Sequence, residues 1–221
     1  MADFPSLGKI SSFMEGLVER EGTTPWGVGF PNEENQAIRF APLLQVVEAD
    51  EDGFTVNDLG CGFADLYRFI RGQGLPMRGY RGHDLTEKML DVAKTRVGSD
   101  AELVSSDRLD QPADYSFACG IFNTKLDASD AEWMDYMKAV IHNLDENSTR
   151  GFAFNSLTSY VDYRESHLFY ADPVEVFDYC KREISPRVAL LHDYPLWEWT
   201  ILIRNPERPS GDASRAVAPA H

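Results

Sequence analysis

Short apolar segments alternate along the chain with stretches of helical periodicity. Each apolar segment ends in glycine or in small polar residues, which predicts buried strands at residues 53–60, 77–84, 114–120 and 151–156. Helices are predicted at residues 63–74, 86–97, 129–144 and 172–184. Strands that alternate with helices imply right-handed crossovers, so we expect a mostly parallel sheet with helices on both faces.

The end of the chain breaks this alternation. Residues 187–194 and 196–205 are two strand-like runs with almost nothing between them. So short a link suits a hairpin, and the last strand is therefore predicted to be antiparallel.

The domain organisation predicted from the sequence is simple. No linker divides the 221 residues, so residues 50–205 are expected to form one catalytic domain. Residues 1–49 precede the first core strand and are expected to form a helical, lid-type segment. Residues 157–170 are longer than most loops and suggest a cap over an acceptor. Residues 206–221 have no apolar period and are expected to be disordered.

Charge and cysteine content favour some partners over others. The chain has 36 acidic and 21 basic residues, a net charge of −15, which would repel nucleic acids and anionic membranes. The three cysteines are far apart and form no CxxC pair, so we expect neither a metal site nor a disulfide, which fits a reducing cytoplasm. No apolar run approaches about 18 residues, so no membrane span is expected.

The stretch NDLGCGFADLYRFI, residues 57–70, is the main functional signal. A strand that ends in a glycine turn and leads at once into a helix presents backbone N–H groups to a ligand. Gly60 and Gly62 allow such a ligand to approach closely, although a tight turn without a ligand has the same pattern. Asp84 lies 22 residues after Gly62, at the end of the next predicted strand, where a carboxylate can accept ribose hydroxyls.

Two cofactor classes fit this geometry, nicotinamide dinucleotides and S-adenosylmethionine. In the dinucleotide pattern G-x-G-x-x-G the third glycine approaches a pyrophosphate, and here that position holds Asp65. A carboxylate is unfavourable beside a pyrophosphate, whereas Asp58, just before the turn, suits a cofactor that carries an ammonium group.

NDLGCGFADL resembles motif I of the class I S-adenosylmethionine-dependent methyltransferases, and YRGHDLTEKMLDVAKTR resembles the strand and helix that follow it. VSSDRLD and ADYSFACGIFN are similar to the third and fourth strands of that family, and the terminal hairpin is a further family feature. The resemblance implies a doubly wound, Rossmann-like sheet of seven strands with only the last antiparallel. It also implies a cofactor site formed by Asp58, Gly60, Cys61, Gly62, Asp84, Leu85, Met89, Asp107, Cys119 and Gly120.

One departure from the family pattern is Ala64, where motif I usually has a third glycine. The blocks TPWGV, GIFN, FNSLTSY, YADP and HDYPLWEWT also resemble a bacterial subgroup of these methyltransferases. That resemblance implies the cofactor but says little about the acceptor.

Other candidate residues have a structural alternative beside the functional one. Arg39 could pair with the cofactor carboxylate or lie on the surface. Asn123 and Asn155, which follow strands, could orient an acceptor or only cap turns. His167 and His192 are candidate general bases, since a histidine pKa lies near neutrality, but either could be purely structural.

These features predict a methyltransferase that transfers a methyl group from S-adenosylmethionine to a small-molecule or carbohydrate acceptor, on oxygen. A nicotinamide-dependent oxidoreductase and a non-catalytic S-adenosylmethionine-binding protein are the alternatives. The acceptor and the oligomeric state are left open.

Overall fold

The computed structural model describes residues 4, 6–29, 32–48 and 52–205. The predicted tail, residues 206–221, lies outside the described residues.

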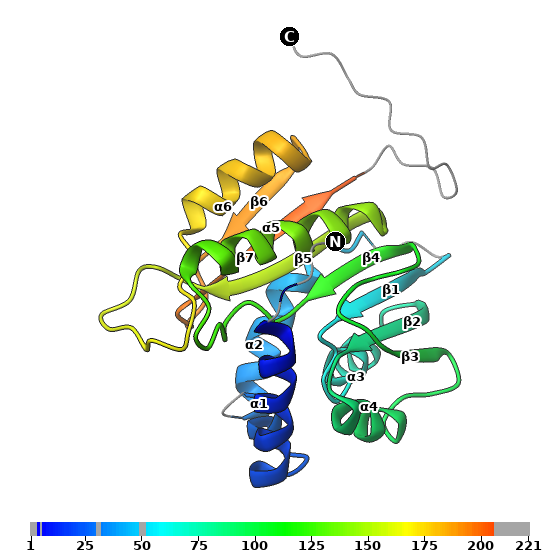
Figure 1. Cartoon of the computed structure of the whole chain (residues 1–221). Helices are drawn as coiled ribbons and strands as arrows, with labels where there is room; N and C mark the ends of the chain where they lie inside the picture. The colour runs from blue at the N-terminus through cyan, green and yellow to red at the C-terminus, as the bar shows by residue number, and fades with distance from the viewer. Residues whose placement is uncertain (1–3, 5, 30–31, 49–51, 206–221) are drawn as a thin grey trace.

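A seven-stranded sheet in the order β3-β2-β1-β4-β5-β7-β6 forms the centre of the molecule (Figure 1). Strands β1 to β5 pair in parallel, whereas β7 is antiparallel to both of its neighbours, β5 and β6. The predicted sheet, with only its last strand antiparallel, is therefore confirmed. The strands are β1 Phe54–Leu59, β2 Met77–Asp84, β3 Ala101–Ser105, β4 Ala113–Ala118, β5 Ser148–Leu157, β6 Val188–Leu191 and β7 Glu198–Arg204.

Helices cover both faces of this sheet. One apolar cluster joins α2, α3 and α4 to one face, and a second cluster joins α5 and α6 to the other. The predicted capping box is present, since the Ser129 side chain accepts from the Glu132 N–H while the Glu132 carboxylate accepts from Ser129. The helices are α1 Ser6–Glu21, α2 Glu33–Leu44, α3 Asp65–Gly72, α4 Glu87–Lys94, α5 Asp130–Glu146 and α6 Pro173–Tyr179; a 3₁₀ turn, Pro25–Val28, follows α1, and a π-helical turn, Cys180–Ile184, extends α6.

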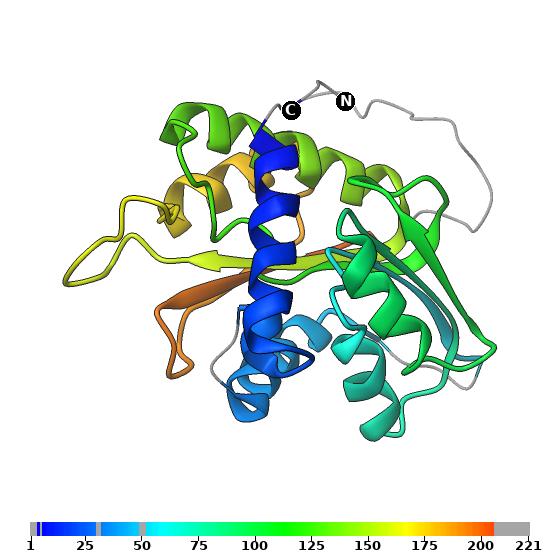
Figure 2. The same cartoon turned by 60° about the horizontal axis from the view of Figure 1, so that its bottom comes forward.

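The strand order reverses direction between β1 and β4. In open α/β sheets a ligand binds at the carboxyl ends of the strands beside such a reversal. Figures 1 and 2 show α1 standing across this end of the sheet, between its two halves. No described residue of α1 is fully buried, whereas α3, α4 and α5 each contribute fully buried side chains.

The segment between β5 and α6 projects away from the body of the protein in both views (Figures 1 and 2). The C-terminal part of this segment pairs with the chain after β4 through an antiparallel β-bridge between Thr124 and Leu168. Of the helices within the described residues, none combines the length and the apolar character that a membrane crossing requires.

Candidate active site

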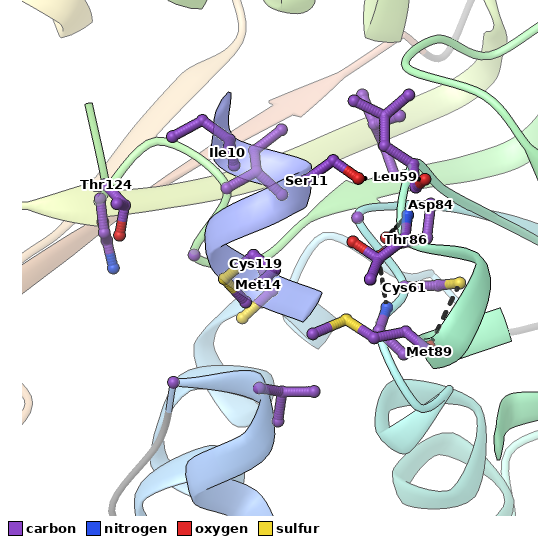
Figure 3. A pocket seen from close by; sticks show the side chains of 18 of the residues that line it. Ile10, Ser11, Met14, Leu59, Cys61, Asp84, Thr86, Met89, Cys119 and Thr124 are labelled. Atoms are coloured by element: carbon purple, nitrogen blue, oxygen red, sulfur yellow. Dashed lines mark hydrogen bonds between the residues drawn. The ribbon is translucent and has the colours of Figure 1, made fainter. Parts of the chain in front are cut away.

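A cavity lies at the carboxyl ends of β1 to β4, and α1 covers it (Figure 3). All but one of the residues that the resemblance and the sequence pattern assigned to the cofactor line this cavity. They are Asp58, Gly60, Cys61, Gly62, Asp84, Leu85, Met89, Asp107, Cys119 and Gly120. Asn123, a predicted acceptor-orienting residue, lines it as well. The topology thus brings together residues that lie more than sixty positions apart in the sequence.

The glycine turn after β1 is held against the end of β2. The backbone N–H groups of Gly60 and Cys61 donate to the carbonyl of His83 at 2.7 and 3.0 Å. Gly60 has φ = 73°, and a Cβ atom there would lie 2.2 Å from Ile121 Cγ2. Both the left-handed conformation and the close packing therefore require glycine at this position.

Ala64, the departure from motif I, also adopts a left-handed conformation, with φ = 60° and ψ = 37°. This backbone region costs an ordinary L-residue roughly 1–2 kcal/mol, which explains why the family pattern has glycine there. Ala64 is fully buried but does not line the cavity. The substitution therefore adds backbone strain beside the site without adding a group to its wall.

The Asp84 carboxylate connects the two turns that form the cavity floor. Its oxygens accept from the backbone N–H groups of Gly62 at 2.9 Å and Thr86 at 2.8 Å (Figure 3). Burial raises the pKa of Asp84, and these backbone hydrogen bonds oppose that rise. A carboxylate can accept about four hydrogen bonds, so Asp84 retains capacity for further donors from a ligand in the cavity.

Asp58 is the other buried carboxylate of the floor, with a 2% exposed side chain. The Tyr80 hydroxyl donates to Asp58 Oδ2 at 2.5 Å. Burial raises the pKa of Asp58 to about 7, although the hydrogen bond from Tyr80 works in the opposite direction. An ammonium group bound here would favour the ionised form of this carboxylate.

α1 supplies a wall that the sequence analysis did not resolve into residues. Its inward side chains are apolar except for Ser11, and they are Leu7, Ile10, Ser11, Phe13, Met14 and Leu17. Positions 7, 10, 14 and 17 recur at helical spacing, which is the signal that could have identified them. From α5, Trp133 and Tyr136 also line the cavity without having been predicted.

Arg39 and Asn155 do not line the cavity but belong to one buried polar network behind it. Arg39 Nε donates to both Glu198 carboxylate oxygens, at 2.8 and 2.9 Å. Asn155 Nδ2 donates to Glu198 Oε2 at 2.8 Å, and Asn155 Oδ1 accepts from the backbone N–H of Gly120 at 2.7 Å. Glu198, which the sequence analysis missed, thus links the N-terminal segment to the turn after β4.

Both candidate bases are exposed and lie outside the cavity lining. The His192 ring packs against Tyr160, with centroids 5.9 Å apart. The carbonyl of His167 accepts from the N–H groups of Lys125 and Leu126, which fixes the backbone there. None of the described residues that line the cavity is a histidine, a lysine or an arginine.

The 157–170 segment contributes no residue to the cavity lining. Its ends lie beside the site, because Asn123 Oδ1 accepts from the Leu157 N–H at 3.0 Å and the Asn123 carbonyl accepts from Phe169. In this structure the segment therefore supports the wall after β4 rather than covering the cavity.

Comparison with known proteins agrees with this geometry. No known family model matches the chain. A protein of Mycobacterium tuberculosis named "Putative methyltransferase Rv1506c" is 43% identical over 165 residues, which cover 73% of this chain and 98% of that protein.

Two solved structures share the fold at low identity. The N-methyltransferase NodS from Bradyrhizobium japonicum WM9, in complex with S-adenosyl-L-homocysteine, has a TM-score of 0.64 at 14% identity, covering 89% of this chain and 98% of that one. Magnesium protoporphyrin IX methyltransferase from Synechocystis PCC 6803, with bound S-adenosylmethionine, has a TM-score of 0.60 at 14% identity, covering 92% and 99%. The chain belongs to the class I S-adenosylmethionine-dependent methyltransferases, which confirms the resemblance seen in its motifs.

Proposed function

We propose that this chain binds S-adenosylmethionine on the turns after β1 and β2 and transfers its methyl group to a small-molecule acceptor. The observation that carries the proposal is the junction of Gly62 and Asp84, where an amide and a carboxylate meet at 2.9 Å on the cavity floor. On this proposal Asp84 accepts the ribose hydroxyls and Asp58 receives the ammonium group. On the same proposal Asp107, two residues after β3, lies near the adenine amine, as the resemblance implies.

Methyl transfer from a sulfonium is an in-line displacement, so the cofactor supplies the activation. The work of this chain is then to hold the acceptor atom, the methyl carbon and the sulfur in line and to exclude water. On this proposal the acceptor occupies the part of the cavity lined by Ile121, Asn123, Thr124 and the inward face of α1.

Oxygen is our first proposal for the acceptor atom. A hydroxyl acceptor has to lose its proton, so the test is which residue accepts that proton. His167 and His192 remain the proposed bases, although reaching the cavity would require movement of the segments that carry them. Nitrogen is the second candidate, favoured by the absence of histidine and lysine from the described lining, because a neutral amine needs no base before it attacks.

Calorimetry with S-adenosylhomocysteine tests the cofactor site. Asp84→Ala should weaken binding roughly tenfold to a hundredfold, since a hydrogen bond to a charged group is worth about 1.5–3 kcal/mol. Asp91→Ala is the matched control, because Asp91 is an exposed aspartate on α4 that pairs with Lys94. Equal affinity of the Asp84→Ala variant and the wild type would refute the ribose assignment.

An acceptor screen that measures S-adenosylhomocysteine formation tests the chemistry. With a hydroxyl acceptor, alanine at the true base should lower turnover by about 10²–10⁴-fold while cofactor affinity stays the same. Normal turnover of both His167→Ala and His192→Ala would favour nitrogen. Cofactor binding without turnover of any acceptor would leave the non-catalytic alternative.

A further inference from the structure

The charged side chains that line the described part of the cavity are all acidic. Its described lining includes four carboxylates and no cationic side chain, and the carboxylates are Asp58, Asp65, Asp84 and Asp107. Two of them are neutralised from outside the lining, since Asp65 pairs with Arg96 at 2.9 Å and Asp107 with Arg108 at 3.0 Å. The other two are buried in the floor. The cavity therefore presents carboxyl groups, and within its described lining no cationic side chain, to anything that enters it.

The part of the cavity away from the cofactor turns is mostly apolar. We call Ile10, Met14, Ile121, Asn123 and Thr124 the acceptor compartment. Figure 3 shows Ile10, Met14 and Thr124 on the side of the cavity opposite Asp84, Thr86 and Met89. Within this compartment the side-chain polar groups are the hydroxyl of Thr124 and the amide of Asn123, whose Oδ1 already accepts from the Leu157 N–H.

We propose that the acceptor is an uncharged small molecule with an apolar body, and that carboxylates and phosphates are excluded. This inference rests on the proposed function, since it describes what occupies the same cavity once the cofactor is bound. A buried anion with no cationic partner loses its hydration without compensation, and nearby like charges add to that cost. The cofactor adds one net positive charge, but Asp58 and Asp84 already oppose it.

The same compartment disfavours two other acceptor classes. A carbohydrate would bring many hydroxyl groups to a wall with few polar partners, and each unpaired buried hydroxyl costs free energy. A cation would be attracted by the carboxylates but would have to leave water for an apolar surface. Of the acceptors predicted from the sequence, the small molecule is thus favoured over the carbohydrate.

Two dyes with the same ring system test whether the cavity binds a neutral molecule in preference to an anion. N-phenyl-1-naphthylamine is neutral, whereas 8-anilinonaphthalene-1-sulfonate carries a sulfonate on the same anilinonaphthalene body. Fluorescence titration of the S-adenosylhomocysteine-loaded protein should give at least tenfold tighter binding of the neutral dye. Equal or tighter binding of the sulfonate would overturn the inference.

A pair of variants on α1 shows whether the cavity lining causes the preference for the neutral dye. Ile10→Lys puts a cation in the acceptor compartment, and because no described α1 residue is fully buried the helix should accommodate it. Ser12→Lys adds the same charge at an exposed position outside the lining. We expect Ile10→Lys to reduce the preference for the neutral dye at least tenfold and Ser12→Lys to leave it unchanged.

The remaining outcomes are also decisive. Equal effects of the two lysine variants would mean that long-range charge, not the cavity, sets the preference. Failure of both dyes to bind a protein that does bind S-adenosylhomocysteine would refute the apolar compartment and leave the proposed function intact. Failure of S-adenosylhomocysteine to bind would instead refute the proposed function.

Discussion

At the scale of single residues, the site depends on carboxylates that the fold keeps out of water. Asp58 has a pKa raised to about 7 by burial, against 3.8 for an unfolded aspartate. Between these two pH values Asp58 therefore keeps its proton in the folded state and loses it in the unfolded state. The stabilising contribution of protonated Asp58 is complete below about pH 4 and is lost as the pH rises through 7.

Cofactor affinity should depend on pH in the opposite sense. If ionised Asp58 receives the cofactor ammonium, the affinity for S-adenosylhomocysteine should increase as the pH rises from 5 to 8 and level off above the pKa of Asp58. In Asp58→Asn the affinity should be lower at pH 8, and its pH dependence should be smaller. Calorimetry from pH 5 to pH 8 measures the affinity of the wild type and of the variant. The same pH profile in the variant would assign the titration to another group, such as Asp84, whose pKa is also raised by burial.

At the scale of secondary-structure elements, a buried ion pair joins α2 to β7. The Arg39 and Glu198 side chains are 11% and 1% exposed, and Asn155 extends their network from β5 to the Gly120 amide. Gly120 lies in the cavity wall, so this network positions the turn after β4 without touching the cavity. Arg39 and Asn155 are thus positioning residues in this structure.

Glu198→Gln should lower the free energy of unfolding by about 3 kcal/mol, because removing one partner of a buried ion pair leaves the other uncompensated. The double variant Arg39→Met with Glu198→Gln should recover part of this loss. Glu175→Gln, an exposed position on α6, is the control. Denaturant unfolding gives the values, and a loss below about 0.5 kcal/mol for Glu198→Gln would show that the pair contributes little.

α1 lies over the cavity without a fully buried described residue of its own. Besides apolar contacts with the cavity, exposed ion pairs hold it to the body, Lys9 with Asp127 at 2.6 Å and Glu19 with Lys88. Surface pairs of this kind contribute only about 0–1 kcal/mol each.

Amide hydrogen exchange should therefore be fast in α1 without cofactor and at least tenfold slower with S-adenosylhomocysteine bound beneath it. Exchange in α6, which contributes no residue to the cavity lining, is the internal control and should change much less than exchange in α1. Unchanged exchange in α1 would mean that the helix does not respond to the occupied cavity.

At the scale of the whole molecule, the sheet is continuous and one domain carries the site. Cofactor binding should therefore stabilise the entire fold by mass action. At a concentration one hundred times its dissociation constant, S-adenosylhomocysteine should add about 2.7 kcal/mol. For a domain of this size that corresponds to a rise in Tm of about 5–10 °C.

NADH at the same concentration should leave Tm unchanged if Asp65 excludes a pyrophosphate. Thermal unfolding with each cofactor distinguishes the two cofactor classes, which the glycine turn alone does not distinguish. A larger shift with NADH than with S-adenosylhomocysteine would restore the oxidoreductase alternative.

The amino-acid sequence by itself predicted six of the seven strands, the antiparallel last strand and the glycine turn after β1, whereas β3 followed only from the family resemblance. These features depend on local patterns: apolar runs form strands, capping residues start helices, and glycines mark the turn between β1 and α3. Since the carboxyl ends of parallel strands share one edge, predicting the strands also placed Gly60, Asp84 and Asn123 at one site.

The tertiary structure alone decided which distant side chains meet. Arg39 and Glu198 are 159 residues apart, and they pair because β7 inserts between β5 and β6 opposite α2. That contact takes Arg39 and Asn155 away from the cavity wall, whereas α1 supplies an apolar wall there. Neither result can be predicted from periodicity. A charged or polar side chain that is still in water favours no particular distant partner, and it becomes tied to one only when packing buries the two together.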